Sequence, residues 1–170
     1  MALTSKLESY NPSWPNLYAE ESATLLPLFG DDLSAIHHVG STAIPGMKAK
    51  PEIDILVVLR ERADFSSYFS VIELKGYRFR GEEPGAPGHW YFSKDQENRR
   101  THKLHLCGPA HPCVSDQLLF RDFLIANPDR ATEYAELKST LEKTNSNGMM
   151  EYLEKKAPFI LETLQRAKLR

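Results

Sequence analysis

The strongest constraint on the fold is a short apolar run, Ile53–Leu59, in which all residues but Asp54 are aliphatic. So many β-branched residues in so short a run are typical of a central strand that is buried on both faces. Because side chains alternate along a strand, Glu52 and Asp54 share one face with Leu56 and Val58. The two acids therefore stand together where this strand begins. Charged residues also commonly mark where a strand leaves solvent, and this alternative stays open for Glu52.

A glycine–serine turn precedes this strand. Glycine lets a chain bend sharply and lets the backbone approach a phosphate, so Gly40 suits such a turn. The helix start that follows offers free N–H groups and the hydroxyls of Ser41 and Thr42 to an anion. Lys48 and Lys50 lie in the connection and can neutralise phosphate charge. With two carboxylates that can bind Mg²⁺ through oxygen, the pattern predicts a site for a nucleoside triphosphate.

Composition excludes several classes of protein. The 170 residues predict one domain, with a sheet-bearing core over 1–112 and a helical tail over 113–170. A net charge of −2 argues against a general nucleic-acid coat, and no apolar run reaches the roughly 18 residues that span a bilayer. Cys107 and Cys113 lack a CxxC spacing, and the N-terminus does not resemble a signal peptide. We expect a cytoplasmic protein with reduced thiols and no membrane contact.

The periodicity of apolar residues predicts an α+β fold. A first helix starts near Pro15, and Asp64 is placed to cap another that runs to Lys75. Besides the central strand, strands are expected at 35–39, 77–80, 89–93 and 101–107. Helical spacing follows over 115–126, 129–143 and 149–169. We therefore expect a short mixed sheet with helices against one face, a cleft on the other, and a C-terminal helical group.

The last predicted strand adds a histidine to the candidate site. If Leu104 and Leu106 join the core, then Lys103 and His105 face the same cleft as the acids. An imidazole there can ligate a metal, carry a proton or contact a phosphate. A strand histidine bonded to neighbouring backbone is an equally good interpretation. His102 lies on the opposite face, so it is not expected to share a zinc site with His105.

Aromatic and basic residues near this cleft allow two interpretations each. The strand aromatics either stack on a base or, more commonly, fill the core; they are Tyr77, Phe79, Trp90, Tyr91 and Phe92. The basic residues of the helical tail either reach substrate phosphates or remain solvated; they are Arg121, Lys138, Lys155 and Lys156.

The segment from Ile36 to Ile55, IHHVGSTAIPGMKAKPEIDI, resembles the signature of the GrpB family. The resemblance extends over nearly the whole chain, through Leu104-His105-Leu106 and the FRDFL segment at 120–124. It implies the minimal nucleotidyltransferase fold of the DNA polymerase β-like nucleotidyltransferase superfamily. In that superfamily a Gly-Ser element holds the triphosphate, two acids on the next strand bind metal, and a later strand supplies a third acid.

Carried over to this chain, the resemblance assigns the triphosphate to Gly40 and Ser41 and the metal to Glu52 and Asp54. His105 stands on the strand of the third acid and would complete the site as ligand or general base. We expect a protein that binds a nucleoside triphosphate with Mg²⁺ and transfers a nucleotidyl group to an unknown acceptor. One alternative is a non-catalytic nucleotide- or metabolite-binding module. Another is a transition-metal site that joins His105, Asp54 and a second histidine.

Overall fold

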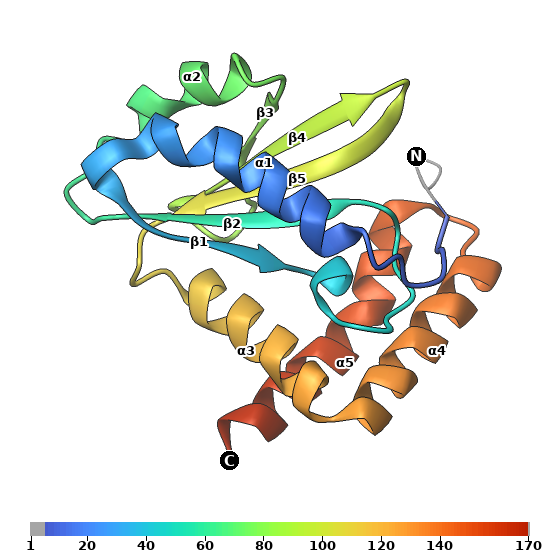
Figure 1. Ribbon diagram of the computed structural model, residues 1–170. Helices are drawn as coiled ribbons and strands as arrows, with labels where there is room; N and C mark the ends of the chain where they lie inside the picture. Colours follow the sequence, from blue (N-terminus) through green and yellow to red (C-terminus); the bar gives the residue numbers. More distant parts are fainter. Residues whose placement is uncertain (1–5, 170) are drawn as a thin grey trace.

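The computed structural model describes residues 6–169, in which a five-stranded mixed sheet carries helices on both faces (Figure 1). The sheet order is β1-β2-β5-β4-β3, and only β2 and β5 run parallel. The strands are β1 (Leu33–Val39), β2 (Ile53–Leu59), β3 (Arg78–Glu82), β4 (His89–Gln96) and β5 (Arg99–Cys107). The α-helices are α1 (Trp14–Phe29), α2 (Phe69–Glu73), α3 (Pro112–Ala126), α4 (Pro128–Thr144) and α5 (Met149–Lys168).

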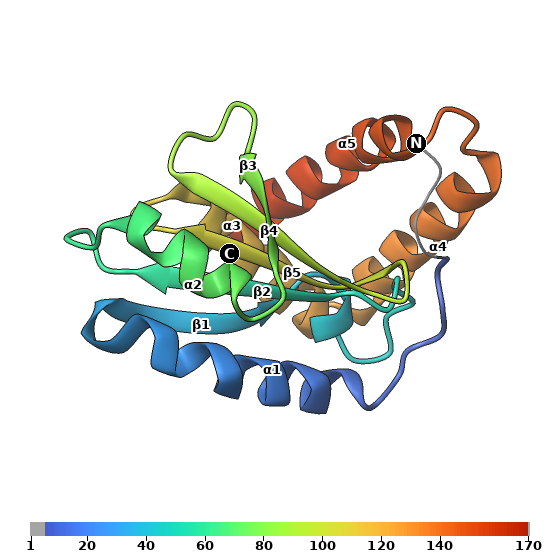
Figure 2. The same ribbon diagram turned by 90° about the horizontal axis from the view of Figure 1, so that it is seen from above.

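One face of the sheet forms the main core under α1 and α2. Ile55 and Val57 of β2 and Leu104 of β5 are fully buried there, packed with Trp14 and Phe29 of α1. Figure 2 shows α1 running along this side of the sheet, with α4 and α5 beyond the other side. Strand alternation assigns Ile55, Val57 and Leu104 to the apolar face. The expected burial of β2 is therefore confirmed.

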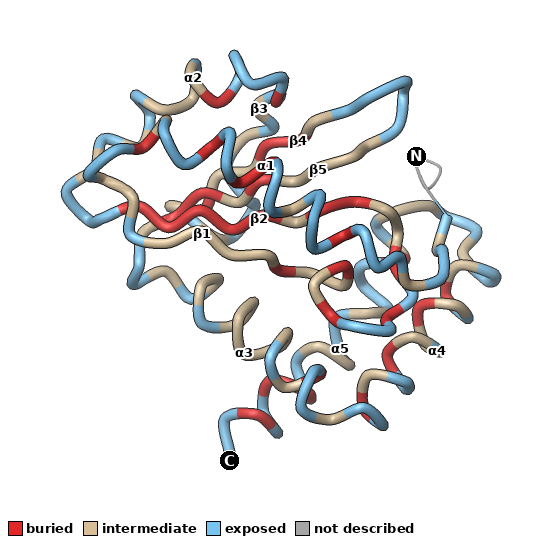
Figure 3. The backbone as a smooth tube through the Cα atoms, in the orientation of Figure 1, coloured by how far each residue is buried: buried red, intermediate tan, exposed pale blue. Residues whose placement is uncertain are grey.

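The opposite face of β2 is shared between packing and the candidate site. Leu56, Val58 and Cys107 form a smaller buried cluster, against which Val114 and Leu118 of α3 pack. The tube in Figure 3 is buried along most of β2. The expected short mixed sheet and C-terminal helical group are confirmed. Helices are not restricted to one face, however, because α3 covers part of the second.

The hairpin of β4 and β5 is longer than the sequence suggested. Glu97 and Asn98 have φ values of 50° and 63° and close a two-residue turn. The polar residues on either side of it, 95–96 and 99–100, pair as strand. The predicted strands, 89–93 and 101–107, did not include them. Backbone pairing in an antiparallel hairpin does not require apolar side chains, which is why hydrophobic patterning missed these ends.

The helix predicted between Asp64 and Lys75 was right in part. Asp64 accepts a hydrogen bond from the Ser66 N–H, as expected of a cap, but the segment begins as a 3₁₀ turn, Phe65–Tyr68, before the short α2. Before α1, an isolated antiparallel bridge pairs Glu8 with Ala49. Residues 1–5 lie outside the described part of the chain. Between residues 6 and 169 no helix is long and apolar enough to cross a membrane.

Candidate functional site

The glycine–serine turn follows β1 directly and lies against the start of β2. Gly40 has a φ of +71°, and a Cβ at this position would collide with the carboxylate of Asp54. Only glycine meets both requirements without strain. A 3₁₀ turn, Ser41–Ala43, then begins at Ser41. The turn and the acidic end of β2 are therefore in direct contact, as the sequence predicted.

The two carboxylates share a cation from the neighbouring strand. Glu52 is only 3% exposed, and its Oε2 lies 2.8 Å from Nζ of Lys103, which lies 3.8 Å from Asp54 Oδ1. Lys103 is the parallel register partner of Asp54 on β5. Burial alone would lower the pKa of Lys103, but the two carboxylates outweigh it and raise the pKa. Burial raises the pKa of Asp54, and Lys103 opposes that shift.

His105 also faces Asp54, and the predicted convergence of these two side chains is present. Its Nε2 lies 4.0 Å from Asp54 Oδ1, and its Nδ1 is 2.9 Å from Nε2 of His89. Burial, aided by His89 and Lys103, lowers the pKa of His105 to about 3. A neutral imidazole at pH 7 suits ligation or hydrogen bonding better than proton transfer. His102 lies on the other face, 3.9 Å from Glu21 Oε2, as expected.

Two lysines of the C-terminal helices reach this site. Lys138 of α4 is buried, and its Nζ donates to Ser41 Oγ at 3.0 Å and to the carbonyl of Lys48. Burial and the charge of Lys156 lower the pKa of Lys138 to about 7. In Lys156 of α5, burial and Lys103 lower the pKa to about 8. Both ammonium groups are thus held where positive charge is already in excess.

The remaining predicted residues differ in their placement. Lys50 turns inward: burial lowers its pKa, and its Nζ lies 5.4 Å from the ring centroid of Tyr152. Lys48 is exposed and contributes its carbonyl rather than its ammonium group. Thr42 is buried, with its hydroxyl 3.0 Å from His38 Nε2 and 3.3 Å from the Glu52 carbonyl. Its hydroxyl thus supports the turn, a role that the sequence did not predict.

Sequence reasoning also missed members of the site. Lys103 was placed on the correct face but given no role, although its alternation with His105 carried that signal. Tyr91, whose ring stacks on His105 with centroids 5.6 Å apart, is the strand aromatic that faces the site. The others pack in the α1 and α2 core, as the more common interpretation held; they are Tyr77, Phe79, Trp90 and Phe92. Neither Arg121, which donates to the His38 carbonyl, nor Lys155, which pairs with Glu151, has a contact with the two acids among those described.

The side chains around Glu52 and Asp54 determine how many divalent cations could bind there. Glu52 and Asp54 offer adjacent carboxylates, which suit one Mg²⁺. The strand that would supply a third acid instead presents Lys103 and His105 toward them. A pair of ions needs more negative charge than these residues provide. The site therefore fits one Mg²⁺ in competition with the Lys103 ammonium group, and does not fit two.

Comparison with known proteins identifies the family and the fold. The chain is 38% identical over 159 residues to the UPF0157 protein YqkA of Bacillus subtilis (strain 168), matching 94% of this chain but only 46% of that protein. The crystal structure of the conserved protein GrpB from Enterococcus faecalis superposes with a TM-score of 0.86 at 29% identity, covering 95% of this chain and 96% of that one.

A more distant likeness concerns the fold alone. The Cid1 poly(U) polymerase, in its crystal structure with Mg 3′-dATP bound, has a TM-score of 0.59 at 10% identity, covering 88% of this chain and 49% of that one. The sheet and its helices thus have a nucleotidyltransferase-like arrangement, as the sequence resemblance implied. The family model described as GrpB protein matches residues 4–166. On this evidence, the chain belongs to the GrpB family.

Proposed function

We propose that this protein binds a nucleoside triphosphate beside the Gly40–Ser41 turn, where the start of β2 is approached by lysines of the helices α4 and α5. The observation that carries the proposal is a group of four lysines around two carboxylates. Lys138 is buried and Lys50, Lys103 and Lys156 are half-buried. Burial and neighbouring lysines lower the pKa values of Lys50, Lys138 and Lys156, whereas Asp54, Glu52 and Glu142 act in the opposite direction. An anion with several charges would relieve their mutual repulsion.

The contacts of two ammonium groups, those of Lys50 and Lys138, support an anionic ligand. Within residues 6–169, Lys50 Nζ is a buried side-chain nitrogen without a hydrogen-bond partner. Such a group costs free energy until a ligand satisfies it. Lys138 donates to Ser41 Oγ beside the turn, so a phosphate on the turn would meet an ammonium group as well as backbone N–H groups. The arrangement favours a chain of phosphates over a single carboxylate ligand.

Titration calorimetry with ATP, GTP, CTP and UTP tests this proposal. Lys138→Met and Lys156→Met keep the aliphatic stem and remove the charge, and each should weaken binding at least tenfold. Lys155→Met is the matched control, because Lys155 is the exposed neighbour of Lys156 on α5 and pairs with Glu151. Its affinity should equal that of the unaltered protein. If none of the four nucleotides binds, or if all three variants behave alike, the proposal is wrong.

Nucleotidyl transfer is a second candidate, favoured by the placement of Glu52 and Asp54 beside the turn. A bound Mg²⁺ would neutralise charge that develops on the phosphates during transfer. Asp54 and Glu52 would hold it, Ser41 and Lys138 would orient the phosphates, and His105 would stay neutral beside Asp54. The acceptor would be a hydroxyl or phosphate group on an unknown molecule.

Release of pyrophosphate separates this second function from binding alone. Labelled ATP, GTP, CTP and UTP should each be tried with Mg²⁺, and any release should disappear in Asp54→Asn. Tight binding that is indifferent to Mg²⁺ and to Asp54→Asn, with no release, would establish the non-catalytic module instead. The third alternative is a transition-metal site at His105 and Asp54. Metal analysis of the purified unaltered protein and of Asp54→Asn tests it. Equal metal content in the two proteins would exclude a site that uses Asp54.

A further inference from the structure

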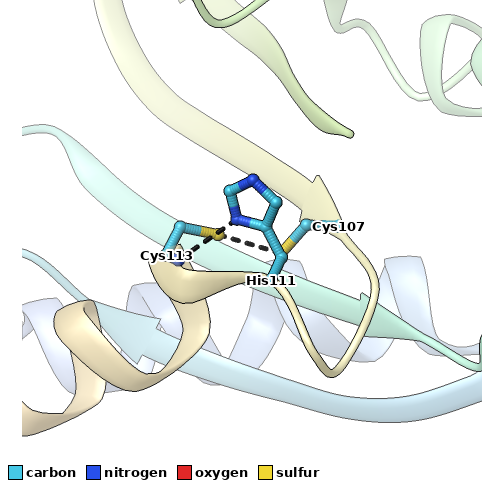
Figure 4. A group of neighbouring side chains, drawn as sticks. All are labelled: Cys107, His111 and Cys113. Atoms are coloured by element: carbon cyan, nitrogen blue, oxygen red, sulfur yellow. Dashed lines mark hydrogen bonds between the residues drawn. The ribbon is translucent and has the colours of Figure 1, made fainter. Parts of the chain in front are cut away.

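A group of potential metal ligands lies outside the proposed triphosphate site, where β5 passes into α3. Cys107 ends β5, His111 is the N-cap residue of α3, and Cys113 lies in its first turn. One ligand atom from each lies within 4.8 Å of the other two. We name these three residues the sulfur–imidazole cluster. Figure 4 shows their side chains turned toward one another.

The backbone holds the cluster in place. Pro112 sits at the first turn of α3, where proline is tolerated, and His111 Nδ1 accepts the N–H of Cys113 at 3.1 Å. Cys107 is fixed by β5, paired with Val58 on one side and His89 on the other. The two sulfur atoms lie 3.0 Å apart. The ligand atoms are therefore brought together by secondary structure on both sides of a short connection.

The two thiols differ in their surroundings. Cys107 is fully buried at the end of β5, whereas Cys113 lies half-buried in the first turn of α3. A thiolate is the form that binds metal, so both thiol protons leave when a metal binds. The cluster is also accessible, since His111 and Cys113 are only half-buried.

We propose that the sulfur–imidazole cluster binds a zinc-class divalent transition metal through Cys107, His111 and Cys113, with a water molecule in the fourth position. Two thiolates and an imidazole are a ligand set that zinc prefers, and tetrahedral coordination would separate the sulfur atoms from 3.0 Å to about 3.8 Å. Binding forms two metal–sulfur bonds and releases the thiol protons to solvent. The metal would tie the end of β5 to the start of α3.

This site is distinct from the one that the sequence suggested at His105 and Asp54. The two sites share no ligand, although Cys107 lies two residues along β5 from His105, which is about 7 Å at the usual rise of a strand. His89 connects the two regions: its ring lies 5.5 Å from that of His111, and its Nε2 is 2.9 Å from His105 Nδ1.

The test measures zinc binding by the reduced, full-length protein in competition with a chromophoric chelator. We expect one Zn²⁺ per chain, and with Co²⁺ a thiolate charge-transfer band and the visible absorption of a tetrahedral ion. Cys113→Ser should weaken binding at least tenfold, and so should His111→Asn, which keeps an N-cap residue for α3. Zinc should also protect both thiols from alkylation.

His37→Asn is the matched control, because His37 lies on β1 outside the cluster. It should bind zinc as the unaltered protein does, and circular dichroism should show that all three variants remain folded. The proposal is overturned if the reduced protein binds no zinc, if Cys113→Ser and His111→Asn bind as tightly as the control, or if oxidation to a disulfide is the only reaction of the pair.

Discussion

Lys103 and Asp54 are register partners on the one parallel strand pair of the sheet, and the Lys103 ammonium group lies between Asp54 and Glu52. A side-chain ammonium group thus stands beside the two carboxylates that we propose as ligands of a divalent cation. Its ion pair with Glu52 is well shielded, because the Glu52 side chain is 4% exposed. Any divalent cation that binds these acids must first displace this contact.

Replacing Lys103 with methionine should make the protein depend on Mg²⁺. The variant Lys103→Met leaves the buried Glu52 and the half-buried Asp54 without their nearest cation, which we expect to lower the free energy of unfolding by about 3 kcal/mol. Added Mg²⁺ should restore much of this loss, whereas the unaltered protein should respond little. Thermal unfolding with and without Mg²⁺ measures both effects. In the double variant Lys103→Met/Asp54→Asn, Mg²⁺ should no longer raise the unfolding temperature. If Mg²⁺ stabilises the unaltered protein, Lys103→Met and the double variant equally, then Lys103 does not compete with Mg²⁺ for these acids.

The affinity for a triphosphate should fall as pH rises. Lys138 and Lys156 have pKa values near 7 and 8, so much of their charge is lost between pH 7 and pH 9. A bound anion favours the charged forms, and binding should therefore take up protons in this range. Calorimetry in buffers of different ionisation enthalpy measures the uptake. Lys138→Met should reduce both the uptake and the pH dependence, and an affinity that is constant from pH 6 to pH 9 would contradict the role of these lysines.

The same lowered pKa values predict a stability trend in the absence of ligand. Between pH 7 and pH 10 the unfolded chain, with Lys138 at its ordinary pKa of 10.5, binds more protons than the folded protein does. The contribution of Lys138 to the free energy of unfolding should therefore increase with pH in this window. Urea unfolding of the unaltered protein and of Lys138→Met across the window isolates this contribution, which the variant should lack.

Substituting alanine at Gly40 should cost more than the same change at Gly46. Both glycines have positive φ, +71° and +75°, so alanine is strained at either position by about 1 kcal/mol. Only at Gly40 would the new Cβ also collide with Asp54, while at Gly46 it meets open space. Urea unfolding should show the larger loss in Gly40→Ala, and calorimetry should show triphosphate binding lost in that variant and retained in Gly46→Ala. Equal effects would mean that the contact with Asp54 is unimportant.

Glu21 should be a stabilising residue of the helix–sheet interface. It lies on α1, accepts from the Tyr77 hydroxyl at 3.0 Å, and pairs with Lys94 Nζ at 2.9 Å. Glu21→Ala should lower the free energy of unfolding by about 2 kcal/mol, because two partly buried donors lose their acceptor. Urea unfolding measures this, with Glu20→Ala as the exposed control on the same helix. A loss no larger than that of Glu20→Ala would contradict the assignment.

Local sequence predicted the parts of this molecule that depend on periodicity. The continuous apolar run around Asp54 predicted the central strand, and the alternation of side chains along it predicted its two faces. The same alternation in the hairpin strand placed His105 on the face of the acids. Patterning missed the polar ends of β4 and β5, since their pairing rests on backbone hydrogen bonds. It also gave no role to Lys103, because the pairing of that residue with Asp54 depends on which strands are neighbours.

The sequence by itself therefore determined the α+β class, the buried β2 strand and the turn at Gly40, since these follow from steric and hydrophobic preferences of neighbouring residues. Only the tertiary structure decided that β5 lies parallel to β2, that Lys138 of α4 reaches Ser41 and Lys156 of α5 lies near Asp54, and that His111 meets two sulfur atoms. Those relationships join residues that are far apart in the chain or separated by an irregular connection, and burial and long-range charge set their chemistry.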